Sequence, residues 1–154
     1  MKATDRGLPK VVGWREWVGL PELGITSLKA KIDTGARTTA LHAVDLRPFE
    51  QDSVKWIEFR VPLAGLPKAD RCRTPILDER EIKNTSGVPE RRYVIETMLV
   101  LGNRHWHIEL ALSDRENMEF ETIIGRTAIR RHALLVDPGR SFLSGPPRRI
   151  APGN

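Results

Sequence analysis

The feature that most constrains this chain is the run from Lys31 to Thr39, where an apolar approach ends in an acid, a hydroxyl and a glycine. Apolar residues at positions 28, 30 and 32 alternate with polar ones, which is typical of a half-buried strand. Asp33, Thr34 and Gly35 are turn-forming residues, so the strand should end there. A second element, Glu121 to Thr127, follows about 90 residues later and carries paired isoleucines before a glycine and an arginine.

The remainder of the chain predicts many short strands with turn signals between them. An alternating run at 92–101 leads through Gly102-Asn103 into another at 105–112, which favours an antiparallel hairpin. A chain of 154 residues suits one domain with one core. We therefore predict an all-β barrel or sandwich. Its strands are expected at 11–18, 25–32, 41–46, 54–61, 92–101, 105–112, 120–124 and 133–136, with a short helix at 127–132.

The domain is expected to occupy residues 11–143. Residues 1–10 are polar and predict a flexible arm, and the Pro-, Gly- and Arg-rich residues 144–154 predict a disordered tail. Between them, residues 62–90 are charged and punctuated by proline and glycine, which predicts a long hairpin or mobile loop with some strand near 73–82.

Taken together, the acid-bearing turn and the later Gly-Arg element resemble the retropepsins, the single-lobe aspartic proteases of retroviruses. The longer run Lys31 to Ala43, with Leu134 to Pro138, is similar to a bacterial family once called ATP-dependent zinc proteases and now described as retropepsin-like. The resemblance covers residues 11–143. It implies a closed β-barrel of the acid-protease fold with one short helix near the C-terminus.

The resemblance implies that Asp33, Thr34 and Gly35 form the catalytic turn of an aspartic endopeptidase. Peptide hydrolysis needs water to be deprotonated while the carbonyl oxygen is protonated, and two carboxylates sharing one proton can do both. The chain has a single Asp-Thr-Gly, so the second Asp33 should come from a second copy in a homodimer. The alternative is that Asp33 is only a turn aspartate bonding its own backbone.

Three neighbouring positions are expected to meet the substrate: Ala36, Arg37 and Arg126. Ala36 has no hydroxyl to offer the paired acids. Arg37 stands where retroviral enzymes commonly carry an acid, so two guanidiniums would lie near the cleft and suit carboxylate recognition. In the alternative interpretation, both arginines are neutralised by an acid from the set Glu119, Glu121 and Asp137.

Partners follow from the same resemblance. Genes of the family often lie beside ATP-grasp ligases that add glutamates to a ribosomal protein, so an acidic or glutamate-tailed peptide is the expected substrate. A second interpretation is a non-catalytic module of the same fold that regulates such a ligase. The chain itself lacks a Gly-x-x-x-x-Gly-Lys motif, so no ATP site and no cofactor are expected.

A zinc peptidase is the third interpretation. His105 and His107 would lie on one face of a strand, and His42 and His132 could complete a set of metal ligands. No His-Glu-x-x-His motif occurs, and Cys72 stands alone, so our expectation remains that no metal is bound.

The net charge and the absence of targeting signals limit the partners and the cellular location that we expect. The net charge is +5 with a pI of about 9.8, but the basic pairs at 91–92 and 130–131 are scattered without interleaved aromatics, so we expect no nucleic-acid partner. The start of the chain lacks an apolar signal segment and no run is long enough to span a membrane. With only one cysteine, the expected location is the cytoplasm and no membrane contact is expected. The tryptophans are expected in the core or a dimer interface; they are Trp14, Trp17, Trp56 and Trp106.

Overall fold

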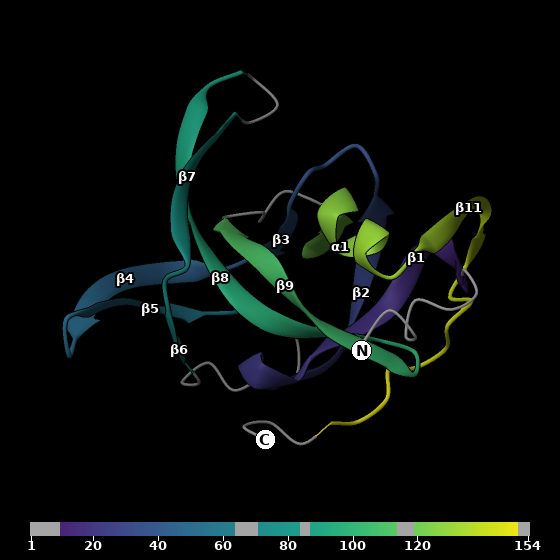
Figure 1. Cartoon of the computed structure of the whole chain (residues 1–154), viewed down its shortest axis with the longest axis horizontal. Coiled ribbons are helices and arrows are strands. Elements are labelled where there is room, and N and C mark those ends of the chain that lie inside the picture. Colours follow the sequence, from purple (N-terminus) through teal and green to yellow (C-terminus); the bar gives the residue numbers. More distant parts are fainter. Residues whose placement is uncertain (1–9, 64–70, 84–86, 114–118, 151–154) are drawn as a thin grey trace.

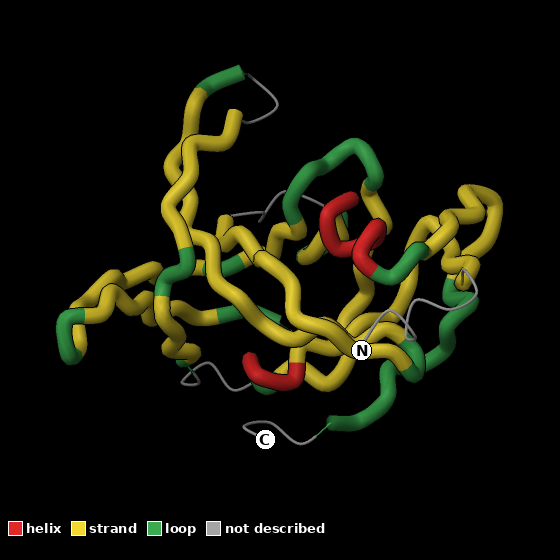
Figure 2. The backbone as a smooth tube through the Cα atoms, in the orientation of Figure 1, coloured by secondary structure: helices red, strands yellow, loops and turns green. Residues whose placement is uncertain are grey.

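The computed structural model describes residues 10–63, 71–83, 87–113 and 119–150. Within them the chain forms eleven strands, a short 3-10 turn and one α-helix. The strands are β1 (Lys10–Leu20), β2 (Ile25–Asp33), β3 (Thr39–His42), β4 (Val44–Gln51), β5 (Val54–Arg60), β6 (Cys72–Pro75), β7 (Asp78–Lys83), β8 (Pro89–Leu101), β9 (Arg104–Ser113), β10 (Thr122–Gly125) and β11 (Leu134–Ser141). The 3-10 turn is Pro21–Leu23 and α1 is Arg126–Arg131. The expected all-β class with one short helix is confirmed, as the predominance of strands in Figure 2 shows.

Eight strands form one mixed sheet in the order β11-β1-β2-β10-β3-β9-β8-β7. An additional pairing of β1 with β8, at Gly19 and Val100, closes six of these strands into a ring (Figure 1). The smaller sheet, β4-β5-β6, extends to one side of the ring. None of the described helices is long and apolar enough to cross a membrane.

The inside of the ring is the hydrophobic core. Alternate residues of each ring strand face inward, as the period of two requires, and Leu41, Ile95, Leu99 and Leu110 have no exposed surface. The expected hairpin is confirmed: β8 and β9 pair from Tyr93 with Leu112 to Leu101 with Arg104. Gly102 takes a positive φ of 60° in the connecting turn, a conformation that favours glycine.

One expected segment differs from its prediction, whereas the strands expected near residues 73–82 are present. The strand expected at 41–46 is two strands in different sheets, because β3 ends at His42 and Asp45 has a positive φ of 55°. Within the expected loop of residues 62–90, β6 pairs with β5, while β7 pairs with β8 from Asp78 with Val94 to Lys83 with Pro89. This β7–β8 hairpin projects from the ring in Figure 1.

The C-terminal segment is attached to the ring by a buried carboxylate. Glu16 is 0% exposed, and its Oε2 accepts hydrogen bonds from the backbone N–H groups of Gly13 at 2.6 Å and Leu143 at 2.9 Å. Its Oε1 accepts from Ser144 N–H at 3.0 Å, and further on Arg148 N–H donates to the Gly102 carbonyl at 2.9 Å. The sequence predicts a disordered tail from residue 144, whereas in the structure hydrogen bonds at Ser144 and Arg148 attach the start of this segment to the ring. The expected arm at 1–10 lies outside the described residues except for Lys10.

We expect Glu16→Gln to lower the free energy of unfolding by about 1–3 kcal/mol, because the amide turns a donor toward a backbone N–H group that then lacks an acceptor. Urea unfolding of the variant measures this. Glu96→Gln is the matched control, since Glu96 is exposed on β8 and should change stability by less than about 0.5 kcal/mol. Equal effects of the two substitutions would show that the Glu16 bonds do not hold the segment.

Candidate active site

Asp33 is the last residue of β2 and lies beside Gly125 in the parallel pairing of β2 with β10. Its Oδ1 accepts a hydrogen bond from Gly35 N–H at 3.0 Å, and its carbonyl accepts one from Ala36 N–H at 3.3 Å. The carboxylate therefore closes its own turn, as the turn-aspartate alternative requires. Among the described residues nothing donates to Oδ2, so that oxygen is left for another group.

The two sequence elements meet through backbone hydrogen bonds. Arg126 N–H donates to the Ala36 carbonyl at 2.8 Å, and Thr127 donates to the Arg37 carbonyl from both N–H at 3.2 Å and Oγ1 at 2.8 Å. The start of the helix thus binds the loop that follows Asp33. Residues separated by about 90 positions in the sequence are thus joined by hydrogen bonds.

Two buried residues make this close approach possible. The Thr39 hydroxyl accepts a hydrogen bond from Gly125 N–H at 3.0 Å. A Cβ at Gly125 would lie 2.6 Å from the Thr38 carbonyl carbon, so only glycine fits without a backbone shift. The role of Thr39 has no local signal in the sequence, because its partner Gly125 is distant in the chain.

Arg126 and Arg37 have different surroundings. The Arg126 guanidinium donates from Nη1 to the carbonyls of Gly35 at 3.2 Å and Thr34 at 3.5 Å, so it positions the Asp33 turn. The Arg37 side chain is exposed. Within the described part of the chain no ion pair joins either arginine to an acid. The alternative interpretation, in which Glu119, Glu121 or Asp137 neutralises both arginines, is therefore not supported there.

Those three acids lie in other environments. Asp137 Oδ1 accepts a hydrogen bond from Gly139 N–H at 2.9 Å, and Glu119 is exposed. Burial raises the pKa of Glu121, an effect that the nearby His42 partly opposes. Glu121 Oε2 is buried, and no group of the described residues donates a hydrogen bond to it.

The four histidines do not converge on one point: two lie on β9, and the other two lie elsewhere. His105 and His107 are both exposed on β9, and His107 Nε2 lies 3.4 Å from Glu22 Oε2. His132 stacks on Trp106 with ring centroids 4.2 Å apart, and His42 is buried at the end of β3. In the described ranges no three metal-binding side chains gather into a candidate site.

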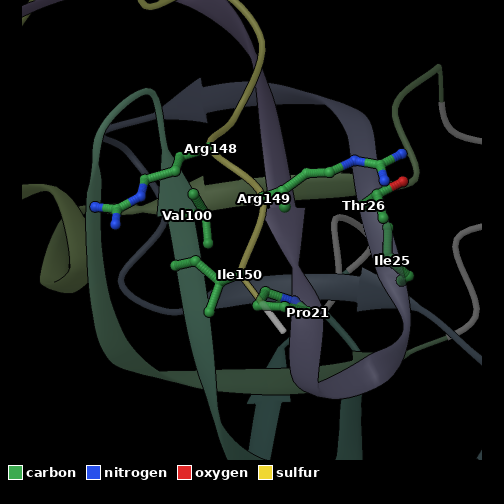
Figure 3. A pocket seen from close by; sticks show the side chains of 8 residues that line it. Pro21, Ile25, Thr26, Val100, Arg148, Arg149 and Ile150 are labelled. Atoms are coloured by element: carbon green, nitrogen blue, oxygen red, sulfur yellow. The ribbon is translucent and has the colours of Figure 1, made fainter. Parts of the chain in front are cut away.

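A cavity of about 250 Å³ lies at the opposite end of β2 from Asp33. Its apolar lining includes Ile25, Val100 and Ile150, and Figure 3 shows Ile150 placed between Val100 and Pro21. The Arg149 side chain extends toward Thr26 in the same view, whereas Arg148 extends away from it. The C-terminal segment therefore forms one wall of this cavity.

We expect Gly125→Ala to destabilise the protein by about 1–3 kcal/mol, because the new methyl group must displace the Thr38 backbone. Thermal or urea unfolding measures the loss. Gly139→Ala is the matched control, because a Cβ there would lie 3.6 Å from Asp137 Oδ1, an ordinary van der Waals contact. A loss for the control as large as that for Gly125→Ala would contradict the steric explanation.

Known proteins of related sequence match most of this chain. Three curated relatives are named probable alpha-L-glutamate ligase: those of Shewanella pealeana (39% identical over 137 residues), Desulfotalea psychrophila (42% over 131) and Parasynechococcus marenigrum (43% over 137). The matches cover 84–88% of this chain but only 28–30% of each relative. The chain therefore corresponds to less than a third of the length of these ligases.

A solved structure and a family model cover nearly the same region. The crystal structure of a Legionella pneumophila protein of unknown function matches with a TM-score of 0.76 and 25% identity, covering 88% of this chain and 98% of that one. The model of the RimB-like family, described as retropepsin-like aspartic endopeptidase RimB, matches residues 11–147. The family model agrees with the expected retropepsin-like fold, and the solved structure shares the fold of this chain. The chain belongs to the RimB-like family of retropepsin-like aspartic endopeptidases.

Proposed function

We propose that this chain is one subunit of a homodimeric aspartic endopeptidase whose catalytic acids are two copies of Asp33. The observation that carries the proposal is the support of the Asp33 turn by Gly125, Arg126 and Thr127. A turn aspartate without function would need only the local bond from Gly35 N–H. Here a second element from the far end of the chain fixes the turn as well, which is how a reactive group is held in a defined position.

The chemistry needs both acids at once. One Asp33 carboxylate takes a proton from water, whose oxygen attacks the peptide carbonyl carbon, while the protonated Asp33 of the second copy donates to the carbonyl oxygen. Protonation of the amide nitrogen then releases the amine product and re-forms the carbonyl as a carboxylic acid. No cofactor is required for these steps.

The homodimer is proposed because one chain supplies one such turn. Thr34 and Gly35 are exposed at its tip, so a second copy has access to them. In the proposed dimer, the Thr34 hydroxyl bonds the backbone of the second copy's turn across a two-fold axis. In this arrangement the Asp33 oxygens that face no donor in one chain face the other copy.

The proposed substrate is an acidic peptide, and Arg37 is the residue that favours it. Its guanidinium is exposed near the Asp33 turn and meets no acid among the described residues. A guanidinium binds a carboxylate through two parallel hydrogen bonds. Arg126 is already occupied with the carbonyls of Thr34 and Gly35, so we assign it a positioning role.

A second candidate function is regulation of a glutamate ligase without proteolysis. The observation that favours it is that relatives of 39–43% identity are named probable alpha-L-glutamate ligase and are more than three times as long as the matched region. A retropepsin-like domain within such a protein could act on the ligase or on its product. The proposed setting for either function is the cytoplasm, where the thiol of Cys72 would stay reduced.

Asp33→Asn should abolish peptide cleavage while the fold is retained, because an amide cannot take the proton from water. Cleavage of a defined set of acidic and neutral peptides, followed by mass spectrometry, measures this. Pepstatin should compete with substrate and 1,10-phenanthroline should have no effect. Asp52→Asn, in an exposed turn, is the matched control.

Full activity of Asp33→Asn, or loss of activity with the chelator and its recovery with zinc, would favour the metal peptidase instead. Absence of cleavage by the wild-type protein, with retained binding of a ligase, would favour the regulatory function.

Mixing tests the dimer. When wild-type and Asp33→Asn subunits are exchanged in equal amounts, activity per wild-type subunit should fall by about half, because half of those subunits then pair with an inactive copy. Sedimentation should show dimers at the concentrations that give activity. Undiminished activity on mixing, together with a monomer in sedimentation, would require a second carboxylate from the same chain.

Arg37→Ala should reduce kcat/KM for glutamate-rich peptides about ten- to a hundred-fold more than for neutral peptides, since a hydrogen bond to a charged group contributes about 1.5–3 kcal/mol. Matched peptide pairs of equal length measure the difference. Arg130→Ala, an exposed arginine of α1, serves as the control. An equal drop on both peptide types would make Arg37 a structural residue.

A further inference from the structure

The outer face of β1 and β2 gathers three cations and a tryptophan that the sequence separates. Arg15 lies directly opposite Lys31, and Trp17 lies directly opposite Lys29, in the antiparallel pairing of these strands. Opposite residues of an antiparallel pair point to the same face. The intervening residues Val18, Leu28 and Ala30 are buried in the core, so the four side chains point away from it. We call these four residues the β1–β2 face.

The three cations of this face have no acidic side chain paired with them in the described part of the chain. Arg15, Lys29 and Lys31 form no ion pair with any described residue, although Lys29 and Lys31 are exposed. By contrast, six arginines elsewhere in the described chain are paired with acids within 4 Å. These are Arg60 with Asp45, Arg71 and Arg73 with Glu58, Arg80 with Asp78 and Glu109, Arg91 with Glu79, and Arg92 with Glu90. Among the described residues Arg37 and Arg126 are also without an acid, so what distinguishes the β1–β2 face is that three such cations share one face with an exposed tryptophan.

The same face carries a stack of planar groups. Trp17 stacks on Phe142 with ring centroids 5.3 Å apart and an interplanar angle of 20°. The Arg15 guanidinium lies 5.2 Å from the Phe142 ring and 4.7 Å from the Trp14 ring. The order is therefore Trp14, Arg15, Phe142, Trp17, and Trp17 at its end is 38% exposed.

The stack is held by a conformation that a phenylalanine rarely adopts. Phe142 has a positive φ of 57°, which is unfavourable for a bulky side chain, and its N–H donates to the Arg15 carbonyl at 2.9 Å. Arg15 Nε in turn donates to the Ser141 hydroxyl at 3.0 Å. Strained residues persist where the surrounding structure over-determines them, and here the result is a ring fixed against Trp17.

We propose that the β1–β2 face binds single-stranded nucleic acid. Lys29 and Lys31 contact phosphates, and a base stacks on the exposed Trp17 ring at the end of the planar stack. Unpaired cations beside an exposed aromatic ring on a sheet are the combination that such binding uses. The sequence does not predict this nucleic-acid site, because its side chains come from three separate segments, 14–17, 29–31 and 141–142, which only the fold brings together. This inference is independent of the proteolysis proposed above.

Fluorescence anisotropy with a labelled 12-nucleotide single-stranded RNA tests the proposal. Lys29→Gln/Lys31→Gln should weaken binding at least about tenfold at low salt and reduce the slope of log affinity against log salt by about 1.4, since each phosphate contact on a single strand contributes about 0.7. Trp17→Leu keeps an apolar side chain and removes the ring. It should weaken binding about five- to 150-fold with an unchanged slope.

Arg73→Gln/Arg91→Gln removes the same charge from ion-paired sites and should leave the affinity within about twofold of wild type. An equal loss in this control would overturn the proposal in favour of non-specific attraction. Tighter binding of duplex than of single strand, or no effect of Trp17→Leu, would also overturn it. If polyglutamate bound as tightly as the RNA and responded to the same substitutions, the face would be a docking surface for an acidic protein.

Discussion

The parallel pairing of β2 with β10 is the constraint on which the site depends. It places Gly125 beside Asp33. Because α1 begins at the next residue, Arg126, the first turn of the helix lies next to the Asp33 turn. Every later contact, from the Arg126 guanidinium to the Thr127 hydroxyl, follows from that register. A shift by one residue would turn Ile124 away from the core and remove the close approach that Gly125 allows.

Because the turn is held from two directions, its position does not rely on local bonds alone. The bond from Gly35 N–H to Asp33 is available to any short turn of this composition. The bonds from α1 are available only after the ring has formed, since their donors come from the other end of the chain. Folding of the ring and completion of the site are thus one event.

Sequence patterns anticipated the elements whose cause is local. The β8–β9 hairpin follows from alternation around Gly102, and the Asp33 turn follows from its own residues and from the later Gly-Arg element. Other features depend on partners distant in the chain and left no local signal. Glu16 lies in a strand otherwise rich in apolar and aromatic residues, and nothing nearby in sequence indicates that it accepts bonds from residues 143 and 144. The division of residues 41–46 between two sheets depends on the path of β4, which local propensity does not determine.

The closure of the ring is narrow compared with its other junctions. β1 and β8 pair only at Gly19 and Val100, whereas β8 and β9 pair continuously from Tyr93 to Leu101. Both closure residues also line the cavity walled by the C-terminal segment, which bonds Gly102 through Arg148 N–H. That segment therefore lies across the narrowest junction of the ring. Without its contacts, the closure of the ring at the opposite end of β2 from Asp33 would depend on a single paired position of β1 and β8.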